Sequence, residues 1–583
     1  MSKRILVLRA LAVLATLGIF AVAFVGVRGF LAVRHLQKAD HIVSALQDEL
    51  GSSLSSGVIA KGAFSVAADA SGDTRAAASL TGDPVWRAVA HLPFVGKYFD
   101  SLRRVSKAAD LIVSEAVQPA LQAASLVIPV RAQIHDATVP TEPFTKALPF
   151  LETAADAALR AQAAVDGARS TGIKSIDSTL QRFRSQLDRL APRVEDARRT
   201  AILVPSMLGG SGIHRYFVGF LSNAESRTQG GFLGSFGILS ATNGKLRFER
   251  FGSDIELKDA PSSVINFGPE FSSVYSGTAV TKSWRDSPQI GDFSEVAQVW
   301  MKLWKAQTGE TLDGAFATDP VALSYALKVT GPAMLPDGEA VSGDDVVANT
   351  ENIAYARFTD NAKRREYLKN VAEAASTKFI TTRSPSTALF SALGRAIEEG
   401  RLKIWSAKPS DEEAILGRPI DGALPQPGLP LAYVAVNNAL GNKMDYYLHR
   451  TLTYTPAACG RGAVIDIAFS TIPSAAGLPV YIAGSAKKLV QNLPFGTTVL
   501  ATAIYVNGGQ TFQSASIDGR PSTLAQNSER GLTQLFTNVT VSPGKVVHLT
   551  IKLAPPPHPG RVRIRTQPLV LPQLLVFKPS PTC

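Results

Sequence analysis

HRYFVGFLSNAESRTQGGFLGSFGILSATNGKLRFERF, residues 214–251, is the stretch in which a helical sequence pattern gives way to strands. Tyr216–Leu221 is an apolar run of strand length, and Phe232–Leu239 follows it after a glycine-rich turn. Lys245–Phe251 alternates polar and apolar residues, as a half-buried strand does. Three strand-like runs in succession predict that a sheet begins here.

The segment that follows these strands carries helical patterns, at 293–308, 319–330, 343–355 and 364–379. Strands that alternate with helices are typical of layered α/β domains. We therefore predict a central α/β domain at residues 209–456.

The segment before the strands is rich in alanine, and its apolar residues recur at helical spacing, as in Leu180, Phe183 and Leu187. Breaks at glycine and proline divide it into several helices. We expect residues 28–208 to form an α-helical stalk or bundle that serves as a spacer and packing platform.

Beyond the central domain the apolar period changes to two, for example in Val464–Phe469. Asn507-Gly508 after Thr498–Val506 predicts a hairpin. Residues 457–555 are therefore expected to form a C-terminal immunoglobulin-like β-sandwich. Residues 556–583 begin with a proline run and are expected to form an extended tail.

The N-terminus carries an uncharged run from Ala10 to Val27, after the basic residues Lys3, Arg4 and Arg9. About 18 apolar or small residues are just long enough to cross a hydrocarbon core. The sequence therefore predicts a cytoplasmic N-terminus at 1–9 and a transmembrane helix at 10–27. It places the protein as a single-pass protein of the cell membrane with most of the chain extracytoplasmic. The alternative is a signal peptide cleaved near residues 21–23.

The composition indicates which classes of partner the protein is expected to contact. The formal net charge is +12, which favours anionic lipid head groups and anionic wall polymers as contacts. The chain carries no nucleic-acid motif or dense basic stripe, so nucleic acid is not expected as a partner. Cys459 and Cys583 are the only cysteines, and they either form one disulfide or remain two thiols.

A polar, glycine-rich loop at residues 223–232 follows the first predicted strand. Loops at the carboxyl ends of strands are where α/β sheets bind ligands. Arg227 offers a guanidinium fork to phosphate or carboxylate, and the glycines permit close approach of the backbone. A tight hairpin with a surface ion pair would have the same sequence.

A second basic cluster, around residues 357–365, spans the junction of two predicted helices. Arg357 ends one helix and Arg364 and Arg365 begin the next, with Asp360 between them. This order places several guanidinium groups around one anion, or else forms a solvated basic turn. The sequences of serine-hydrolase elbows, zinc proteases and Walker loops do not occur.

Several motifs in order resemble a family of bacterial membrane proteins known as domain of unknown function 4012. The motifs include the 223–232 loop, Leu92–Gly96, Thr330-Gly331-Pro332 and Asn442–Leu448. The family name carries no activity.

The α/β region also resembles, more distantly, the LytR-CpsA-Psr family, whose members transfer glycopolymers from a polyprenyl-pyrophosphate carrier to the cell wall. This resemblance implies that Arg357, Asp360, Arg364 and Arg365 hold a pyrophosphate. It implies that Glu225 or Arg227 lies in the first polar loop and that Asp254 is the acidic residue after the third strand. Glu225 and Asp254 are then the candidate catalytic residues and the candidate ligands of an Mg²⁺ ion.

The chain departs from that family at Thr228–Phe232, where the transferases carry a metal- and phosphate-binding segment. Two hypotheses follow. In the first, the protein handles a polyprenyl-pyrophosphate-linked glycan or cell-wall polymer in the envelope, as a phosphotransferase-type enzyme. In the second, it is a non-catalytic scaffold or polysaccharide-binding protein.

Overall fold

The computed structural model describes residues 24–38, 62–93, 95–168, 170, 172, 174–383, 387–485, 492–556 and 560–579. The chain divides into two compact units. The first comprises Met1–Ile134 and Thr138–Ser211, and the second comprises His135–Ala137 and Gly212–Cys583.

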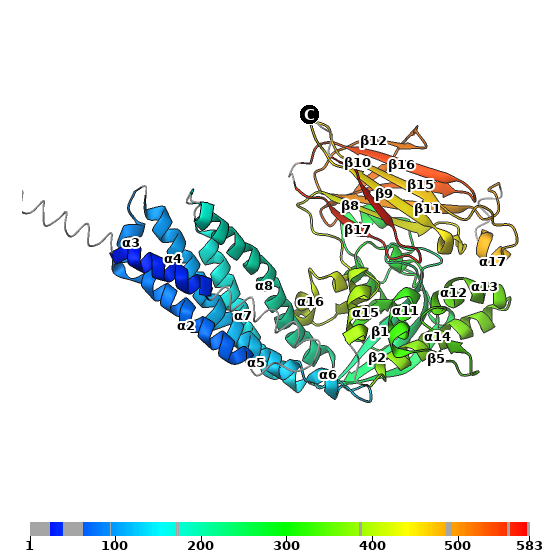
Figure 1. Ribbon diagram of the computed structural model, residues 1–583. Coiled ribbons are helices and arrows are strands. Elements are labelled where there is room, and N and C mark those ends of the chain that lie inside the picture. The colour runs from blue at the N-terminus through cyan, green and yellow to red at the C-terminus, as the bar shows by residue number, and fades with distance from the viewer. Residues whose placement is uncertain are drawn as a thin grey trace, which may run out of the picture. The chain divides into compact units, whose positions relative to one another are not determined.

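The first unit is built from helices (Figure 1). Besides the helical residues 24–38, they are α2 (Ala63–Gly82), α3 (Pro84–Ala90), α4 (Gly96–Asp110), the π-helix η1 (Leu111–Val117), α5 (Gln118–Val127), α6 (Val130–Gln133), α7 (Glu142–Asp166) and α8 (Lys174–Met207). Alanines at 108, 154, 157, 158 and 161 are at most 1% exposed at the contact of α4, α7 and α8. Such small side chains let helices approach closely, so this core is a packing surface.

The structure contradicts the predicted transmembrane helix at 10–27. Residues 10–23 lie outside the described part of the chain, and the helices that are described include none with the length and apolar character needed to cross a bilayer. Residues 24–38 pack within the first unit, where Arg28 pairs with Asp83 at 2.9 Å and Lys38 pairs with Asp73 at 2.8 Å. The single-pass placement in a cell membrane depended on that helix and is not retained.

The second unit contains a mixed sheet of five strands in the order β3-β2-β1-β4-β7. The strands are β1 (Ile213–Ser222), β2 (Phe232–Thr242), β3 (Lys245–Ser253), β4 (Gly314–Thr318) and β7 (Lys403–Ser406). β1 is antiparallel to β2 and parallel to β4. The apolar run Tyr216–Leu221 thus lies in a central strand, where it is buried on both faces.

Helices and short turns surround this sheet. They are η2 (Asp254–Glu256), α9 (Pro269–Tyr275), η3 (Ser287–Gln289), α10 (Phe293–Thr308), α11 (Pro320–Thr330), α12 (Val346–Ala348), η4 (Asn349–Ile353), α13 (Ala354–Arg357), α14 (Asn361–Ile380), α15 (Thr387–Glu398), α16 (Pro409–Ile415) and η5 (Pro419–Asp421). The strands β5 (Ala333–Met334) and β6 (Ala340–Val341) form a separate ribbon.

Alternate residues of β1 face the two helical layers. Phe217 packs in the cluster that contains Trp300 of α10. Phe220 packs in the cluster that contains Leu323 of α11 and Ala372 of α14. Ser222 has the same parity as Phe220, so the end of β1 directs its polar side chain to the α11 and α14 side.

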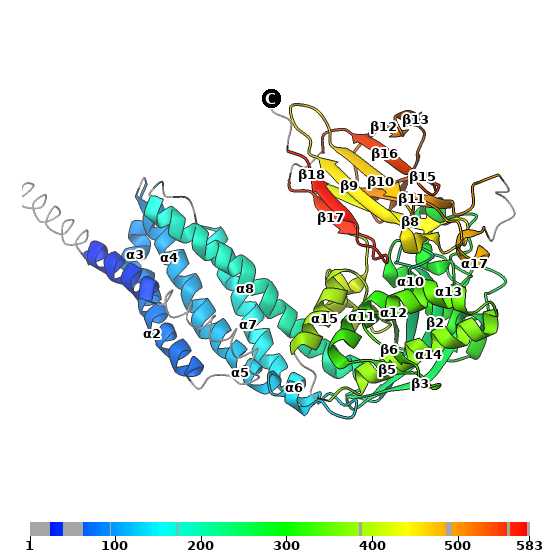
Figure 2. The same ribbon diagram turned by 45° about the vertical axis from the view of Figure 1, so that its right-hand side comes forward.

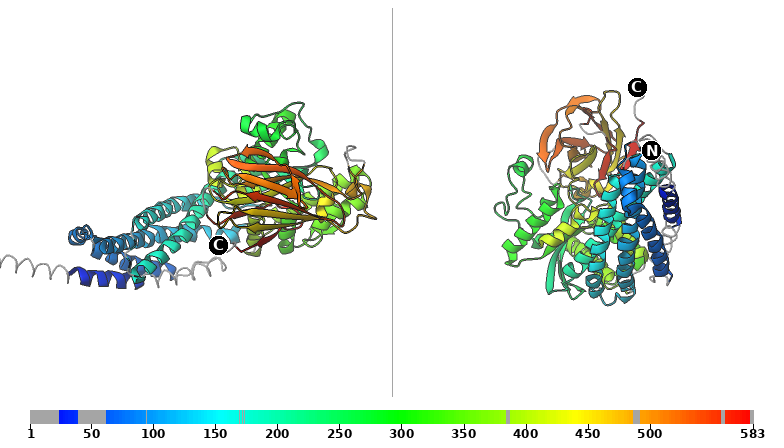
Figure 3. Two further views of the ribbon diagram at one scale, coloured as in Figure 1. Left: turned by 90° about the horizontal axis from the view of Figure 1, so that it is seen from above. Right: turned by 90° about the vertical axis from the view of Figure 1, so that its left-hand side faces the viewer.

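Two further sheets pack face to face as a β-sandwich (Figures 2 and 3). Their orders are β13-β12-β16-β10-β9-β18 and β14-β15-β11-β8-β17. Inward residues of β10 and β11, such as Ile467 and Ile504, are fully buried between them. The strands are β8 (Leu431–Asn438), β9 (His449–Thr455), β10 (Val464–Ser470), β11 (Thr498–Val506), β12 (Phe512–Ile517), β13 (Arg520–Ser522), β14 (Ala525–Glu529), β15 (Leu532–Val541), β16 (Val546–Leu553), β17 (Arg563–Thr566) and β18 (Leu574–Phe577).

The sandwich extends beyond residues 457–555 at both ends. It begins at β8, a strand that is buried almost throughout and so lacks the alternation that marks a half-buried strand. At the other end, β17 and β18 lie within the predicted tail and pair in parallel with β8 and β9. The predicted hairpin at Asn507-Gly508 is also wrong, because β11 pairs with β8 and β15 while β12 lies in the opposite sheet.

Candidate functional site

A cavity of about 430 Å³ lies at the carboxyl end of β1, where α11, η4 and α14 meet two segments of the sandwich. The apolar part of the lining includes Phe220, Leu323, Leu368, Val371 and Ala372. The charged residues of the lining are Glu225, Arg227, Asp254, Asp259, Arg285, Asp286, Glu351, Arg364, Arg365 and Lys443. The cavity therefore combines apolar side chains with many charged ones.

The loop after β1 contributes an ion-paired cluster to the cavity. Glu225 accepts hydrogen bonds from Arg227, at 2.8 Å, and from Lys443. Burial alone would raise the pKa of Glu225, but Lys443 and Arg227 together lower it to about 2. Glu225 is thus held ionised and is a poor general base at neutral pH. Nε of Arg227 is buried and has no hydrogen-bond partner among the described residues.

Aromatic rings surround the two innermost cations. The Lys443 ammonium lies 4.4 Å from the ring centroid of Phe232 and 5.5 Å from that of Tyr355. The Arg364 guanidinium lies 3.9 Å from the ring centroid of Tyr481, which stacks on Tyr355. Cation–π contacts of this kind stabilise charges that have lost water.

Asp254 brings two arginines together at the more exposed part of the cavity. Its carboxylate lies 2.6 Å from Arg285 and 3.1 Å from Arg365. The side chain of Asp254 is 9% exposed, whereas those of Arg285 and Arg365 are 48% and 27% exposed. Two guanidinium groups therefore converge on one oxyanion while keeping donors that face outward.

Glu351 is a cavity residue that sequence reasoning missed. It lies in the π-helix η4, and such segments occur often at functional sites. Its carboxylate accepts hydrogen bonds from Ser222 Oγ, at 2.9 Å, and from the Ala224 N–H, at 2.6 Å. Burial raises the pKa of Glu351 to about 7, despite these two hydrogen bonds. Glu351 and Tyr355 are four residues apart, a spacing that places two side chains on the same face of a helix. This spacing is the feature of the sequence from which their proximity could have been predicted.

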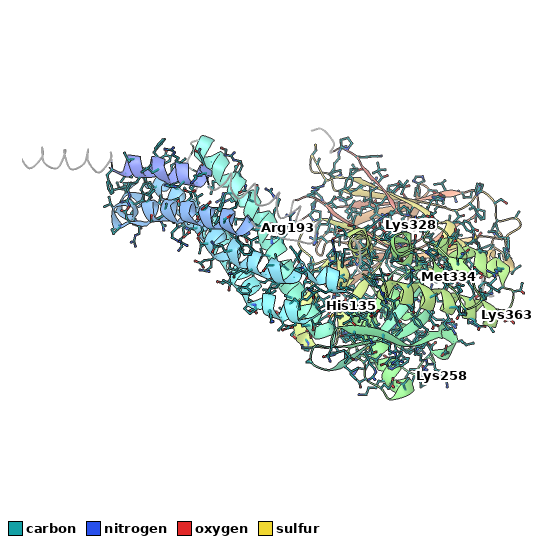
Figure 4. All side chains as sticks on the ribbon, turned by 60° about the horizontal axis from the view of Figure 1, so that its bottom comes forward. His135, Arg193, Lys258, Lys328, Met334 and Lys363 are labelled. Carbon is teal, nitrogen blue, oxygen red and sulfur yellow. The ribbon has the colours of Figure 1, made fainter. Side chains whose placement is uncertain are left out.

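The basic cluster at 357–365 is divided by the structure. Arg364 is 3% exposed and lines the cavity, although Lys363 beside it is exposed at the surface (Figure 4). Arg357 lies outside the lining and pairs with Glu339 at 2.7 Å. Asp360 also lies outside and caps α14 by accepting from backbone N–H groups. Glu225, Arg227, Asp254, Arg364 and Arg365 are the predicted site residues that the cavity brings together.

The predicted magnesium ligands do not fit a bound metal ion. Glu225 and Asp254 each already pair with two cationic side chains. Within the described residues, no group of three or more His, Cys, Asp or Glu side chains is placed to hold a metal ion. Mg²⁺ binding stays a prediction, and no chemical step is derived through it.

The loop itself is anchored in the rest of the unit. Ser226 donates from its N–H and its hydroxyl to Asp445, at 3.0 and 2.6 Å. The N–H of Thr228 donates to Asn437 at 2.8 Å, and Gln229 donates to two backbone carbonyls. Residues 226–229 therefore connect the end of β1 to the sandwich, through Ser226 and Thr228, and to the loop at 290–291, through Gln229.

The paired glycines serve the same connection. Gly230 has φ +122°, a conformation that disfavours residues with a Cβ atom. A Cβ atom on Gly231 would lie 2.0 Å from the Ser222 carbonyl oxygen. Glycine is required here by the close return of the chain.

Cys459 lies in the turn between β9 and β10 and is not a free thiol. Cys583 lies outside the described residues. The predicted pairing of the two cysteines therefore stays a prediction.

Comparison with known proteins identifies one family. Residues 211–355 match the model of a family described as a protein of unknown function (DUF4012), which supports the resemblance that the motifs indicate. The match covers Glu225, Asp254 and Glu351 but ends before Arg364 and Lys443. No curated protein and no solved structure matches the chain. The resemblance to LytR-CpsA-Psr enzymes is thus not shown by these comparisons.

Proposed function

We propose that the cavity at the end of β1 binds a polyprenyl-pyrophosphate-type ligand, with its anionic group beside Asp254 and its hydrocarbon chain on the apolar residues of the lining. The observation that carries the proposal is that apolar side chains and arginines line the same cavity. Arg285 and Arg365 converge on Asp254, and Phe220, Leu323 and Leu368 line the same space.

The charged residues of the lining support an oxyanion ligand. Arginine forks bind phosphate oxygens in pairs, and both Arg285 and Arg365 keep N–H donors exposed. The unpartnered Nε of Arg227 is a further donor deeper in the cavity. A phosphate bound beside these arginines would gain charge-assisted hydrogen bonds.

The apolar residues of the lining support a hydrocarbon chain. They come from β1, α11 and α14, which are rigid elements. A cavity of about 430 Å³ has room for only a few isoprene units, so we expect a longer chain to leave through the opening. Burial of each CH₂ group contributes about 0.8 kcal/mol.

The test uses the full chain and farnesyl pyrophosphate as the probe, with inorganic pyrophosphate and farnesol as its two halves, titrated with Mg²⁺ and with a chelator. We expect farnesyl pyrophosphate to bind more tightly than either half. Arg285→Gln and Arg365→Gln should each weaken its binding about tenfold, the loss of one charge-assisted hydrogen bond. Arg215→Gln, an exposed arginine paired with Glu249, is the matched control and should leave the affinity unchanged.

If farnesyl pyrophosphate and pyrophosphate bound with equal affinity, the apolar residues of the lining would not contribute to ligand binding, and that part of the proposal would be wrong. If Arg285→Gln and Arg365→Gln bound farnesyl pyrophosphate as tightly as the Arg215→Gln control, the proposed anion site beside Asp254 would be wrong. Binding that requires Mg²⁺ would restore the metal prediction that the ion pairs of Glu225 and Asp254 argue against.

A second candidate, a non-catalytic binding or assembly protein, is supported by the anchored loop at Ser226–Gln229. The side chains of Ser226 and Thr228 bond to Asp445 and Asn437, and that of Gln229 bonds to the Ile290 and Gly291 carbonyls, so these three are engaged within the protein. Incubation of the protein with a lipid-linked pyrophosphoryl glycan and a wall-polymer acceptor distinguishes a protein that transfers the bound glycan from this non-catalytic candidate. Recovery of intact donor with retained binding supports the second, whereas transfer excludes it.

A further inference from the structure

A second cavity of about 430 Å³ lies between the loop at 417–426, β7 and β17. Its lining includes Lys403, Arg563 and Arg565. It shares no lining residue with the cavity at the end of β1, although Thr228 and Gln229 of the anchored loop border it. None of these basic residues was singled out by the sequence.

Four basic side chains line this cavity, those of Lys403, Arg418, Arg563 and Arg565. Three of them, Lys403, Arg563 and Arg565, donate to backbone carbonyl groups. Lys403 Nζ donates to the Gln229 carbonyl oxygen at 2.5 Å. Arg563 donates to the Gln426 carbonyl oxygen, and Arg565 donates to that of Ala423. Across the described ranges of the chain, none of the three forms an ion pair with a carboxylate, and Nε of Arg563 is buried without a hydrogen-bond partner.

Of the three acidic residues of the lining, Glu398 is exposed and the other two are engaged by other groups. Glu399 pairs with Arg395 at 2.8 Å and with Arg401 at 2.6 Å. Asp421 accepts hydrogen bonds from two backbone N–H groups, and burial raises the pKa of its carboxyl. With four basic and three acidic side chains, the lining carries a net positive charge.

We propose that this second cavity binds a small oxyanion ligand, a sugar or similar molecule that carries a phosphate ester or a carboxylate. Guanidinium and ammonium donors around one space match the acceptor oxygens of such a group. A volume of about 430 Å³ lies within the range of small-molecule sites. An anion in this space would offset the cost of burying cations that lack acidic partners.

Lys403 supplies a readout that a purely structural role would not give. Burial, with Arg565 and Arg401 nearby, lowers the pKa of Lys403 to about 7, and Asp319 opposes this shift. A bound anion adjacent to Lys403 would raise that pKa again. Binding at pH 8 should therefore take up protons, which appears in calorimetry as an enthalpy that depends on the ionisation enthalpy of the buffer.

The experiment titrates the full chain with glucose 1-phosphate, glucuronate and glucose. We expect one or both acids to bind with proton uptake and glucose not to bind. Arg563→Gln and Arg565→Gln should each weaken binding at least about tenfold. Arg561→Gln, an exposed residue outside the lining, is the matched control and should have no effect.

Each result decides the proposal. The two acids distinguish a phosphate site from a carboxylate site. Farnesyl pyrophosphate binding, together with the thermal midpoint, reports whether each variant is folded. Failure of both acids to bind the wild-type chain, or equal binding by the Arg563, Arg565 and Arg561 variants, would overturn the proposal.

Discussion

The two cavities of the second unit bury positive charge in opposite ways. In the first, Glu225 pairs with Lys443 and Arg227, and Asp254 pairs with Arg285 and Arg365. In the second, Lys403, Arg563 and Arg565 donate to backbone carbonyl oxygens, and Arg565 also lies over the ring of Tyr433. A carboxylate partner compensates for lost water, whereas a carbonyl dipole does so only in part. The comparison teaches that buried cations alone do not identify a ligand site, because their partners decide what they still attract.

The largest expected effect is the loss of a compensating charge in the first cavity. Glu225→Gln leaves Lys443, whose side chain is 4% exposed, without a carboxylate partner. We expect the free energy of unfolding to fall by about 3–5 kcal/mol. Urea denaturation followed by tryptophan fluorescence measures it, since four of the five tryptophans lie in the second unit.

The control for that change is Glu249→Gln, which removes a pair between side chains that are 33% and 47% exposed. Its cost should stay below about 1 kcal/mol. Similar losses in the two variants would mean that burial does not strengthen the dependence of Lys443 on Glu225.

The next effect concerns the proton on Glu351. Its pKa is about 7 in the folded protein and about 4.5 when exposed, so the folded state binds the proton more tightly. This contribution to stability is complete below pH 4.5 and is lost as the pH rises to 7, by about 3 kcal/mol. The Glu351→Gln variant has no titratable carboxyl at this position, so its stability lacks this dependence on pH. The free energy of unfolding of the wild-type protein should therefore fall relative to the variant across this window, and parallel curves would contradict the buried carboxyl.

The second cavity should respond to pH with the opposite sign. The pKa of Lys403 is about 7 when folded and 10.5 when exposed, so folding releases its proton above pH 7. The stability of the wild-type protein should rise relative to Lys403→Met by about 2 kcal/mol between pH 7 and pH 8.5. A constant difference would show that Lys403 keeps its charge, and would place an undetected acidic partner beside it.

Much of the layered fold follows from local patterns. The apolar run Tyr216–Leu221 lies within β1, and the helical pattern at 293–308 coincides with α10. The sandwich boundaries were missed for a physical reason, because β8 is buried on both faces and has no alternation to detect. The tail strands pair only with distant partners, so no local signal marks them.

The site was harder to predict, because it depends on contacts between distant segments. The polar loop and Arg364 could be singled out from the sequence, but Lys443 reaches Glu225 across more than two hundred residues. Glu351 resembles an ordinary helical glutamate until Ser222 and burial are known. Within one short basic segment, only the three-dimensional position separates Arg357 from Arg365.

That separation gives the smallest expected effect. Arg357 is 47% exposed, pairs with Glu339 and lies over the rings of Phe358 and Tyr367, outside the first cavity. Arg357→Ala should therefore leave the affinity for farnesyl pyrophosphate within about twofold and cost less than about 1 kcal/mol of stability. Arg365→Ala in the same segment should weaken binding about tenfold. If the two variants lost affinity equally, the basic segment as a whole would hold the anion, and the cavity would have to open toward Arg357 when a ligand binds.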